Sequence, residues 1–351
     1  MTSPSPALVG VLYDFPQADK GALFEESLRL GIEEISATGR LDRPVDLLAR
    51  HSNGLPAGTA IDIERDFASL VDAGALVVVG PSVSDNGLIA RDLSDRSGLP
   101  CINYTGGEHT RGNFMFHYQV GSLAEEPVLL ARHIHDRGYK SVAAAHDHSP
   151  VGRGYAESFA DACARLGLEL AATAAVPALA DDLSPVVRRL RNANPDCVVY
   201  LGLGVAARAL AVGLSSLGWK VPVAANSALM FGYARRDWRE DWEDWVYVDT
   251  VGDDNAVRAA LAERSRRSAA GPIGVAAYDM GRLVAEAIAR ASHLTRKGIR
   301  DALETIKQIP AASGMQGTTM GFGNWDHGAL KGRYLVLRAW KQGRSVQVTD
   351  Q

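Results

Sequence analysis

Residues 75–110 constrain the fold more than any other stretch of the chain. Two short apolar runs, Ala75–Val79 and Leu99–Asn103, flank a helical pattern over Asp85–Ser97, and each run ends in a loop of Ser, Thr and Gly. This order predicts two parallel strands that are neighbours in one sheet. Ligands of open α/β sheets bind beyond the carboxyl ends of the strands, and hydroxyl and free N–H groups there suit polar or anionic groups. We therefore expect half of a small-molecule site in this stretch.

Strand and helix patterns alternate along the rest of the chain as well. Helical spacing over Gly21–Ala37 and Ala60–Ala73 separates further apolar runs, and a second series begins near Gly121. An alternation of this kind requires mostly parallel sheets with helices on both faces. Because 351 residues are ample for two hydrophobic cores, we expect two α/β domains.

The stretch 75–110 resembles the first lobe of type I solute-binding proteins, the branched-chain amino acid (Leu/Ile/Val) binding family of ABC transporters. The resemblance continues through Ser141–Glu157, Asp196–Asn226, Ala276–Ala291 and Gly314–Gly343. It implies the type I periplasmic binding protein fold, in which two Rossmann-like lobes with parallel sheets flanked by helices are joined by a hinge of three chain crossings.

The resemblance also implies where the two lobes divide. The crossings are expected near Phe116–Gly121, Tyr247–Val251 and Gly328–Arg333. Lobe 1 then comprises residues 7–119 and 251–327, and lobe 2 comprises residues 120–250 and 328–351. A hinge of several strands permits closure over a ligand in the cleft between the lobes. The implied partners are a small-molecule ligand (an organic acid, amide or amino-acid-like compound) and an ABC permease that senses closure.

The candidate ligand-binding residues lie at the ends of predicted strands and in the turns that follow them. They are Phe15, Ser82, Val83, Ser84, Tyr104, Thr105, Gly106, Val151, Tyr155, Gly204, Asn226 and Ser227. The resemblance implies that Ser84 and Thr105–Gly107 hold a ligand carboxylate, and that Val151 replaces an aromatic residue in the turn before Tyr155. Ser and Thr also cap helices and stabilise turns, and both roles can hold at once.

One departure from the family pattern bears on the ligand. Amino-acid binders of this family carry an acid just after the strand that here reads Val221–Ala225, and this chain has Asn226 and Ser227 instead, with no acid anywhere in residues 221–236. A buried ammonium group without a counter-charge is costly. Gly204 also stands where the family often has a tyrosine. We therefore expect a carboxylate, an amide or a larger apolar acid rather than an α-amino acid.

A second motif suggests a different class of function. Gly202–Ala207 follows a predicted strand, opens a helix and matches the G-x-G-x-x-A pattern of dinucleotide-binding proteins, which would make the chain a nucleotide-dependent oxidoreductase. The pattern also needs an acid about 20 residues further on, and the next acid is Asp237. A tight turn at the rim of a site explains the motif better. With no P-loop and no G-x-S-x-G elbow, we expect neither an enzyme nor a bound cofactor.

Three smaller features have ordinary structural explanations. His146, Asp147 and His148 form a polar strand-end loop rather than a metal site, because nothing in the sequence fixes further ligands beside them; we expect no metal. A helically spaced stripe, Trp238, Trp242 and Trp245, is typical of core packing, with an aromatic wall for a ligand as the alternative. The odd number of cysteines (Cys101, Cys163 and Cys197), all in apolar patterns, predicts free buried thiols.

Charge and the N-terminal sequence limit the partners and the location. The net charge of −4 gives no electrostatic footprint for nucleic acid, and no apolar run is long enough to insert into a bilayer. The first strand begins near Ala7 with no signal peptide before it, which favours the cytoplasm, or the periplasm or cell surface if an export signal has been removed. A cytoplasmic sensor acting on a regulatory protein is therefore an alternative. A repressor of the lactose type would need an N-terminal helix-turn-helix, for which there is no room.

Overall fold

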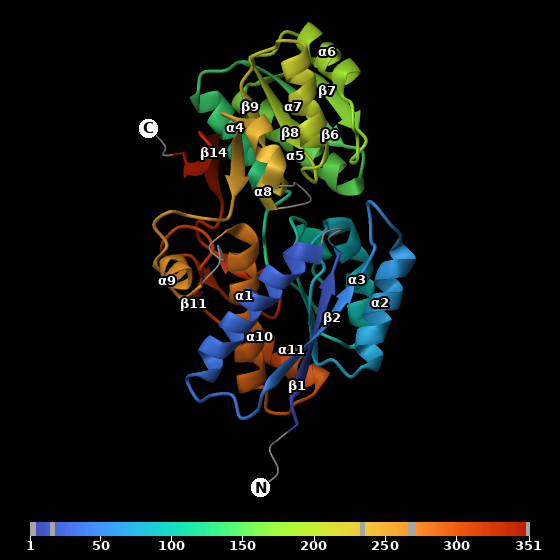
Figure 1. The fold of residues 1–351 in the computed structure, drawn as a ribbon, viewed down its shortest axis with the longest axis vertical. Helices are drawn as coiled ribbons and strands as arrows, with labels where there is room; N and C mark the ends of the chain where they lie inside the picture. Colours follow the sequence, from blue (N-terminus) through green and yellow to red (C-terminus); the bar gives the residue numbers. More distant parts are fainter. Residues whose placement is uncertain (1–4, 15–17, 232–235, 266–270, 349–351) are drawn as a thin grey trace. The chain divides into compact units, whose positions relative to one another are not determined.

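The computed structural model describes residues 5–14, 18–231, 236–265 and 271–348, and the chain divides into two compact units. Unit 1 consists of Met1–Val120 and Val251–Tyr334, and unit 2 consists of Gly121–Thr250 and Leu335–Gln351 (Figure 1). Each unit has its own parallel sheet with helices packed against it. The α/β class expected from the alternating pattern is confirmed.

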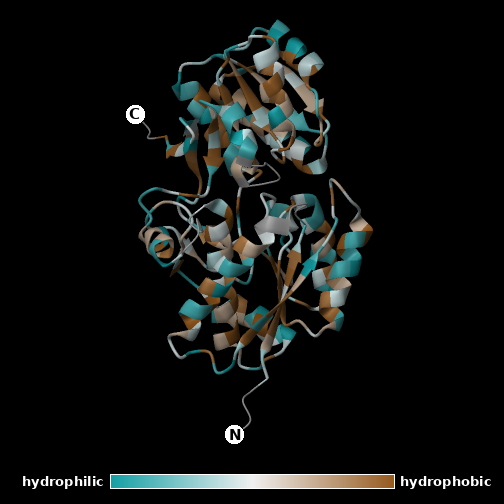
Figure 2. Cartoon of the chain, in the orientation of Figure 1, coloured by the Kyte–Doolittle hydropathy of each residue, from teal (hydrophilic) through white to brown (hydrophobic). Residues whose placement is uncertain are grey.

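The sheet of unit 1 is built mostly from apolar, buried strands, whereas its edge strand at residues 45–51 is partly exposed. Its strands are β1 (Ala7–Tyr13), β2 (Val45–His51), β3 (Val77–Val79), β4 (Cys101–Asn103) and β5 (Met115–His117). They pair in parallel in the order β2-β1-β3-β4-β5, and Figure 2 shows them largely in the brown of apolar residues. The predicted neighbours β3 and β4 are indeed adjacent, so the loops after both strands lie at the same edge of the sheet.

The helices of unit 1 come from both of its chain segments. They are α1 (Ala18–Ser36), α2 (Ala60–Asp72), α3 (Ser84–Ser97), the 3-10 turn η1 (Glu108–Thr110), α9 (Ala256–Arg264), α10 (Pro272–Arg290) and α11 (Arg296–Leu303). Every residue of α10 from Gly274 to Ile288 is buried, and α10 lies beside α1 (Figure 1). Across the described part of the chain, no helix combines the length and apolar character needed to cross a membrane.

The last chain segment of unit 1 ends later than the family resemblance implies. A small antiparallel sheet joins β11 (Ile309–Pro310), β12 (Thr319–Met320) and β13 (Leu330–Lys331). The return to the second lobe is expected near Gly328–Arg333; in this range β13 pairs with β12, and Gly328 bridges to His117 at the end of β5. These pairings keep residues 328–334 in unit 1.

Unit 2 repeats the strand order of unit 1 and extends it. Its strands are β6 (Ser141–Asp147), β7 (Glu169–Val176), β8 (Cys197–Leu201), β9 (Val223–Ala225), β10 (Val246–Asp249), β14 (Val336–Lys341) and β15 (Arg344–Gln347). The order is β7-β6-β8-β9-β10-β14-β15, parallel as far as β10 and antiparallel from there. The first strand of each unit therefore lies between the second and the third.

The helices of unit 2 cover its sheet and bury the tryptophan stripe. They are α4 (Glu125–Asp136), α5 (Pro150–Leu166), α6 (Ser184–Asn192), α7 (Ala206–Ser216), α8 (Ala228–Phe231) and the 3-10 helix η2 (Arg236–Trp242). Trp242 and Trp245 belong to the core under α6 and α7, and Trp238 packs against it. Core packing is thus the correct interpretation of the stripe.

The three cysteines are free and buried, as the sequence predicts. Burial raises the pKa of Cys163 to about 11 and that of Cys197 to about 12, and it also raises the pKa of Cys101. Because the thiolate is the reactive form, these side chains behave as small apolar groups at neutral pH.

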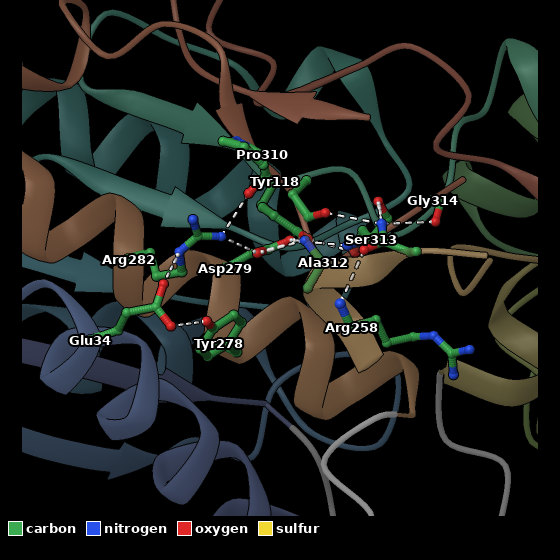
Figure 3. Close-up of polar contacts among 12 residues, drawn as sticks. Glu34, Tyr118, Arg258, Tyr278, Asp279, Arg282, Pro310, Ala312, Ser313 and Gly314 are labelled. Atoms are coloured by element: carbon green, nitrogen blue, oxygen red, sulfur yellow. Dashed lines mark hydrogen bonds and ion pairs between the residues drawn. The ribbon is translucent and has the colours of Figure 1, made fainter. Parts of the chain in front are cut away.

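A buried carboxylate, Asp279 of α10, organises the interior of unit 1 (Figure 3). Its two oxygens accept the backbone N–H of Ala312 at 3.0 and 2.9 Å, and one of them also accepts that of Ser313 at 3.2 Å and the hydroxyl of Tyr118 at 2.8 Å. Arg282 lies 3.4 Å from Asp279 and 3.2 Å from Glu34, so the buried charges are paired. Burial raises the pKa of Asp279, and the charge of Arg282 opposes that shift.

The segment that Asp279 holds also contacts each place where the chain enters or leaves unit 1. Tyr118 lies just before the first exit. Val251, where the chain returns, forms a bridge with Gly314, and the N–H of Met315 donates to the carbonyl of Arg333 at 2.9 Å, just before the last exit. One buried charge therefore fixes three distant parts of the chain relative to one another within unit 1.

Helices α1 and α10 approach so closely that glycine is required at their contact. A Cβ on Gly31 would lie 2.1 Å from the Tyr278 carbonyl oxygen. We expect Gly31→Ala to lower the free energy of unfolding by about 1–3 kcal/mol, because backbone atoms cannot yield as side chains do. Gly154→Ala in α5 is the control: its Cβ meets Leu123 at 3.8 Å, so helix propensity should raise stability by about 0.5–1 kcal/mol. Urea denaturation measures both, and equal effects would contradict the proposed close packing.

Candidate functional site

The loop after β3 is held by Asp14, the residue that follows β1. Asp14 is buried, and its carboxylate accepts the Ser82 N–H at 2.9 Å, the Ser82 hydroxyl at 2.6 Å, the Val83 N–H at 2.9 Å and the Asn86 amide at 2.9 Å. Burial raises the pKa of Asp14, while these hydrogen bonds lower it. Asp14 therefore fixes the predicted site residues Ser82 and Val83 just before the first turn of α3.

Ser84 begins α3 and differs from its neighbours in the loop. Its side chain is nearly buried, and no hydrogen bond to its hydroxyl is found among the residues that the structure describes. The first N–H groups of any α-helix lack partners inside the helix, and the helix dipole is positive at that end. The start of α3 can therefore donate hydrogen bonds to a polar or anionic group.

The loop after β4 is tied together by its own hydroxyl groups. Thr105 is buried, its hydroxyl donates to Asn103 Oδ1 at 3.0 Å, and the Gly107 N–H donates to Thr105 at 3.2 Å. Tyr104 is also buried and stacks on Phe24, with ring centroids 4.9 Å apart. Among the predicted residues of this loop, the structure leaves Gly106 the most accessible. Thr105 thus has a turn role in this loop, a role that can coexist with a ligand contact.

His117 of β5 supports the same loop as a neutral side chain. Its Nε2 lies 2.8 Å from the Thr105 carbonyl oxygen, and its Nδ1 accepts from Arg111 Nε at 3.3 Å. Since Arg111 can only donate and a carbonyl can only accept, the proton is assigned to Nε2. Burial lowers the pKa of His117 to about 3. The loop after β4 therefore keeps this support at any pH near neutrality.

In unit 2 the glycine-rich turn after β8 is already occupied by side chains of this chain. The Gly202 N–H donates to Asn226 Oδ1 at 3.0 Å, the Leu203 N–H to Asp147 at 2.7 Å, and the Gly204 N–H to the Tyr200 hydroxyl at 3.2 Å. A pyrophosphate would need these same N–H groups. The geometry therefore argues against a dinucleotide at Gly202–Ala207 and gives Asn226 and Gly204 roles in shaping the turn.

Asp147 is the unit 2 counterpart of Asp14. It ends β6, is completely buried, and accepts the Tyr200 hydroxyl at 2.9 Å in addition to the Leu203 N–H. A Cβ on Gly202 would lie 2.3 Å from its carboxyl carbon, so only glycine fits there. The described residues contain no group of three or more His, Cys, Asp or Glu side chains placed to hold a metal ion.

A buried acid, Glu126, lies beside Ser227. Its Oε2 accepts the Ser227 N–H at 2.6 Å, and its Oε1 accepts the Ser227 hydroxyl at 3.0 Å, the Tyr155 hydroxyl at 2.8 Å and the Ser122 N–H at 2.7 Å. Glu126 is in the first turn of α4, whose dipole favours a negative charge. Burial nevertheless raises its pKa to about 7. Two predicted site residues, Tyr155 and Ser227, are thus brought together by a carboxylate.

Two predicted site residues remain, Val151 and Phe15. Val151 is buried in the core formed by α4, α5 and the sheet of unit 2. Phe15 lies outside the described residues. The structure therefore supports no ligand contact for Val151 beyond its place in the first turn of α5.

The sequence patterns did not reveal that three acids hold these loops, although each acid left a signal. Asp14 and Asp147 stand at the ends of predicted strands, where the neighbouring loops need acceptors for their N–H groups. Glu126 shares helical spacing with the buried residues Leu123 and Leu130, and an acid at a core position of a helix requires a partner. What no local pattern shows is which loop each acid reaches.

Comparisons with known proteins agree with this architecture. The periplasmic binding protein family matches residues 7–343. No curated protein matches the chain in sequence. A type 1 periplasmic binding protein from Bordetella pertussis Tohama I is 18% identical with a TM-score of 0.82, over 98% of this chain and 100% of that one.

Two further solved structures were obtained with amino acids bound. The branched-chain amino acid transporter substrate-binding protein LivJ from Streptococcus pneumoniae, in complex with isoleucine, is 17% identical with a TM-score of 0.81. An ABC transporter substrate-binding protein from Desulfitobacterium hafniense, in complex with Leu, is 19% identical with a TM-score of 0.80. Each alignment covers 98% of this chain and 100% of the other. These likenesses establish the fold.

The raised pKa of Glu126 gives a pH dependence of stability with a definite sign. An unfolded Glu loses its proton near pH 4.5, while the folded protein keeps that proton until about pH 7. The folded state therefore binds more protons across this window, and stability falls as the pH rises through it. Relative to Glu126→Gln, which does not titrate, we expect the wild type to lose roughly 3 kcal/mol of unfolding free energy between pH 4.5 and pH 8.

Chemical denaturation at several pH values measures this difference. Glu125→Gln, at the exposed neighbouring position, is the matched control and should follow the wild-type curve. A wild-type minus Glu126→Gln difference that stays constant from pH 4.5 to pH 8 would show that burial does not disfavour the Glu126 charge.

Proposed function

This chain belongs to the periplasmic binding protein family, and from that premise we propose that it binds a small polar ligand bearing a carboxylate or amide group and catalyses no reaction. Strand-end loops supply the ligand contacts, with Ser84 of the loop after β3 as a principal donor and Ser227 of the loop after β9 as a further contact. The chain then acts as the solute-binding component of an ABC-type uptake system. Two similar structures contain isoleucine and Leu, which supports a ligand of comparable size.

The start of α3 is the observation that carries this proposal. Asp14 takes the N–H groups of Ser82 and Val83, so the donors left to a ligand are the Ser84 hydroxyl and the first N–H groups of the helix. A carboxylate or amide oxygen accepts such donors well. The loop before them is anchored by the buried carboxylate of Asp14, which follows a different strand.

The oxidoreductase alternative loses its main support. The N–H groups of Gly202, Leu203 and Gly204 all donate to side chains of the same unit. A dinucleotide would have to displace Asn226, Asp147 and Tyr200, and would leave their buried polar groups without partners.

A thermal-shift screen tests whether the chain binds a ligand of this kind. Purified protein is screened against organic acids, amides, amino acids and NAD(P). A compound at one hundred times its Kd should stabilise the fold by about 2.7 kcal/mol, a visible shift in Tm. A shift with NAD(P) and with none of the other compounds would contradict the proposal.

Ser84→Ala then tests the site with the best compound from the screen. We expect affinity to fall about tenfold, because a hydrogen bond to the ligand is lost. Ser97→Ala, at the other end of α3, is the control, since its hydroxyl donates within the helix to Leu93 at 2.7 Å. Equal affinities for the two variants, measured by calorimetry, would remove Ser84 from the site.

A further inference from the structure

Glu126 fixes the direction of the hydroxyl groups in the unit 2 loops. Ser227 donates its hydroxyl hydrogen to Glu126 Oε1 at 3.0 Å, and Tyr155 donates to the same oxygen at 2.8 Å. An ionised carboxylate can only accept, and a hydroxyl has one hydrogen to give. Toward any further partner, the oxygens of Ser227 and Tyr155 can therefore act only as acceptors.

The same arrangement occurs independently in unit 1. Ser82 donates its hydroxyl hydrogen to Asp14 at 2.6 Å, and the Ser82 N–H donates to the same oxygen at 2.9 Å. Asp14 is buried and follows β1, whereas Glu126 is buried in the first turn of α4. Each unit thus has a predicted ligand-binding serine that donates its hydroxyl hydrogen to a buried acid.

Because the Ser227 hydroxyl oxygen can only accept a hydrogen bond, it limits which ligand groups can lie against it. A carboxylate oxygen is also an acceptor, so it would meet the serine lone pairs without a hydrogen between them. It would also bring another negative charge close to Glu126, in surroundings where charges interact strongly. An amide N–H or an ammonium group supplies the missing hydrogen, and an ammonium group also balances the charge.

We propose that Glu126 is a positioning residue that selects the ligand: by orienting the Ser227 hydroxyl, it makes the unit 2 loop accept an N–H group and reject a group that has only acceptors. The inference rests on the proposed function, in which Ser227 contacts the ligand. It removes from the proposed ligand class the compounds whose only polar group is a carboxylate and adds amines, which leaves compounds that carry a primary amide or an amine.

The test compares compounds of one carbon skeleton that differ in this group. The probes are 4-methylpentanamide, L-leucine and 4-methylpentanoate, with benzamide and benzoate as a second set, measured by calorimetry at pH 8.5, where Glu126 is ionised. In the wild type, the best N–H compound should bind at least about tenfold more tightly than its matched carboxylate. Glu126→Gln, whose amide can donate to Ser227, should reduce this ratio to within about threefold, and Glu125→Gln should preserve it.

The outcomes separate this inference from the function on which it rests. A carboxylate that binds the wild type as tightly as the matched amide or amine would overturn the inference and leave the binding function intact. If the ratio of N–H compound affinity to carboxylate affinity is equal in Glu126→Gln and Glu125→Gln, Glu126 does not select the ligand. Failure of every probe to bind, while compounds of the thermal-shift screen do bind, would overturn the ligand class; failure of both sets would overturn the binding function as well.

A second measurement needs no ligand. In a double-mutant cycle of Glu126→Gln and Ser227→Ala, the effects on the unfolding equilibrium constant should differ from additivity by about fivefold or more, because the two side chains share a buried hydrogen bond. Additive effects would overturn the orientation of Ser227. If Glu126→Gln does not fold, Ser227→Ala carries the selectivity test, since it removes the oriented hydroxyl and should narrow the ratio in the same way.

Discussion

Buried carboxylates that accept backbone N–H groups hold the loops of this protein in place. Asp14 and Asp147 stand at strand ends, and Glu126 and Asp279 lie in helices. Each accepts N–H groups from a loop that belongs to another element. A loop that follows a parallel strand has N–H groups with no partner in the sheet, and leaving them buried without acceptors would be costly. A carboxylate can accept several of them at once, so the hydrogen bonds that it accepts offset the cost of burying its charge.

In both units a buried acid accepts N–H groups from the loop after the same strand of the sheet. The first strand of each unit lies between the second and the third, and an acid at its carboxyl end reaches the loop after the third strand. In unit 1 that loop is 82–83, at the start of α3, and in unit 2 it is 202–204, before α7. The shared strand order explains this repetition, because it places the end of the first strand beside the neighbouring loop in both sheets.

Glu126 places a carboxylate beside Ser227 that the sequence of that loop does not show. The sequence comparison found no acid in residues 221–236, and that observation stands. The conclusion that an ammonium group would lack a counter-charge does not follow from it, because α4 places a carboxylate 2.6 Å from the Ser227 N–H. A search along one strand-end loop cannot detect a charge that another element supplies.

The sequence by itself determined the α/β class, the adjacency of β3 and β4, the core role of the tryptophans and the free buried cysteines. These follow from hydrophobic periodicity and loop composition, which act over short stretches of chain. The tertiary structure decided which acid accepts the N–H groups of which loop, and where unit 1 ends. It also decided which hydroxyl groups donate to buried acids. Asp14 reaches Ser82 across 68 residues and Glu126 reaches Ser227 across 101. Such pairings depend on how strands are ordered in a sheet and on which helix packs beside them, and no local pattern of residues encodes that order.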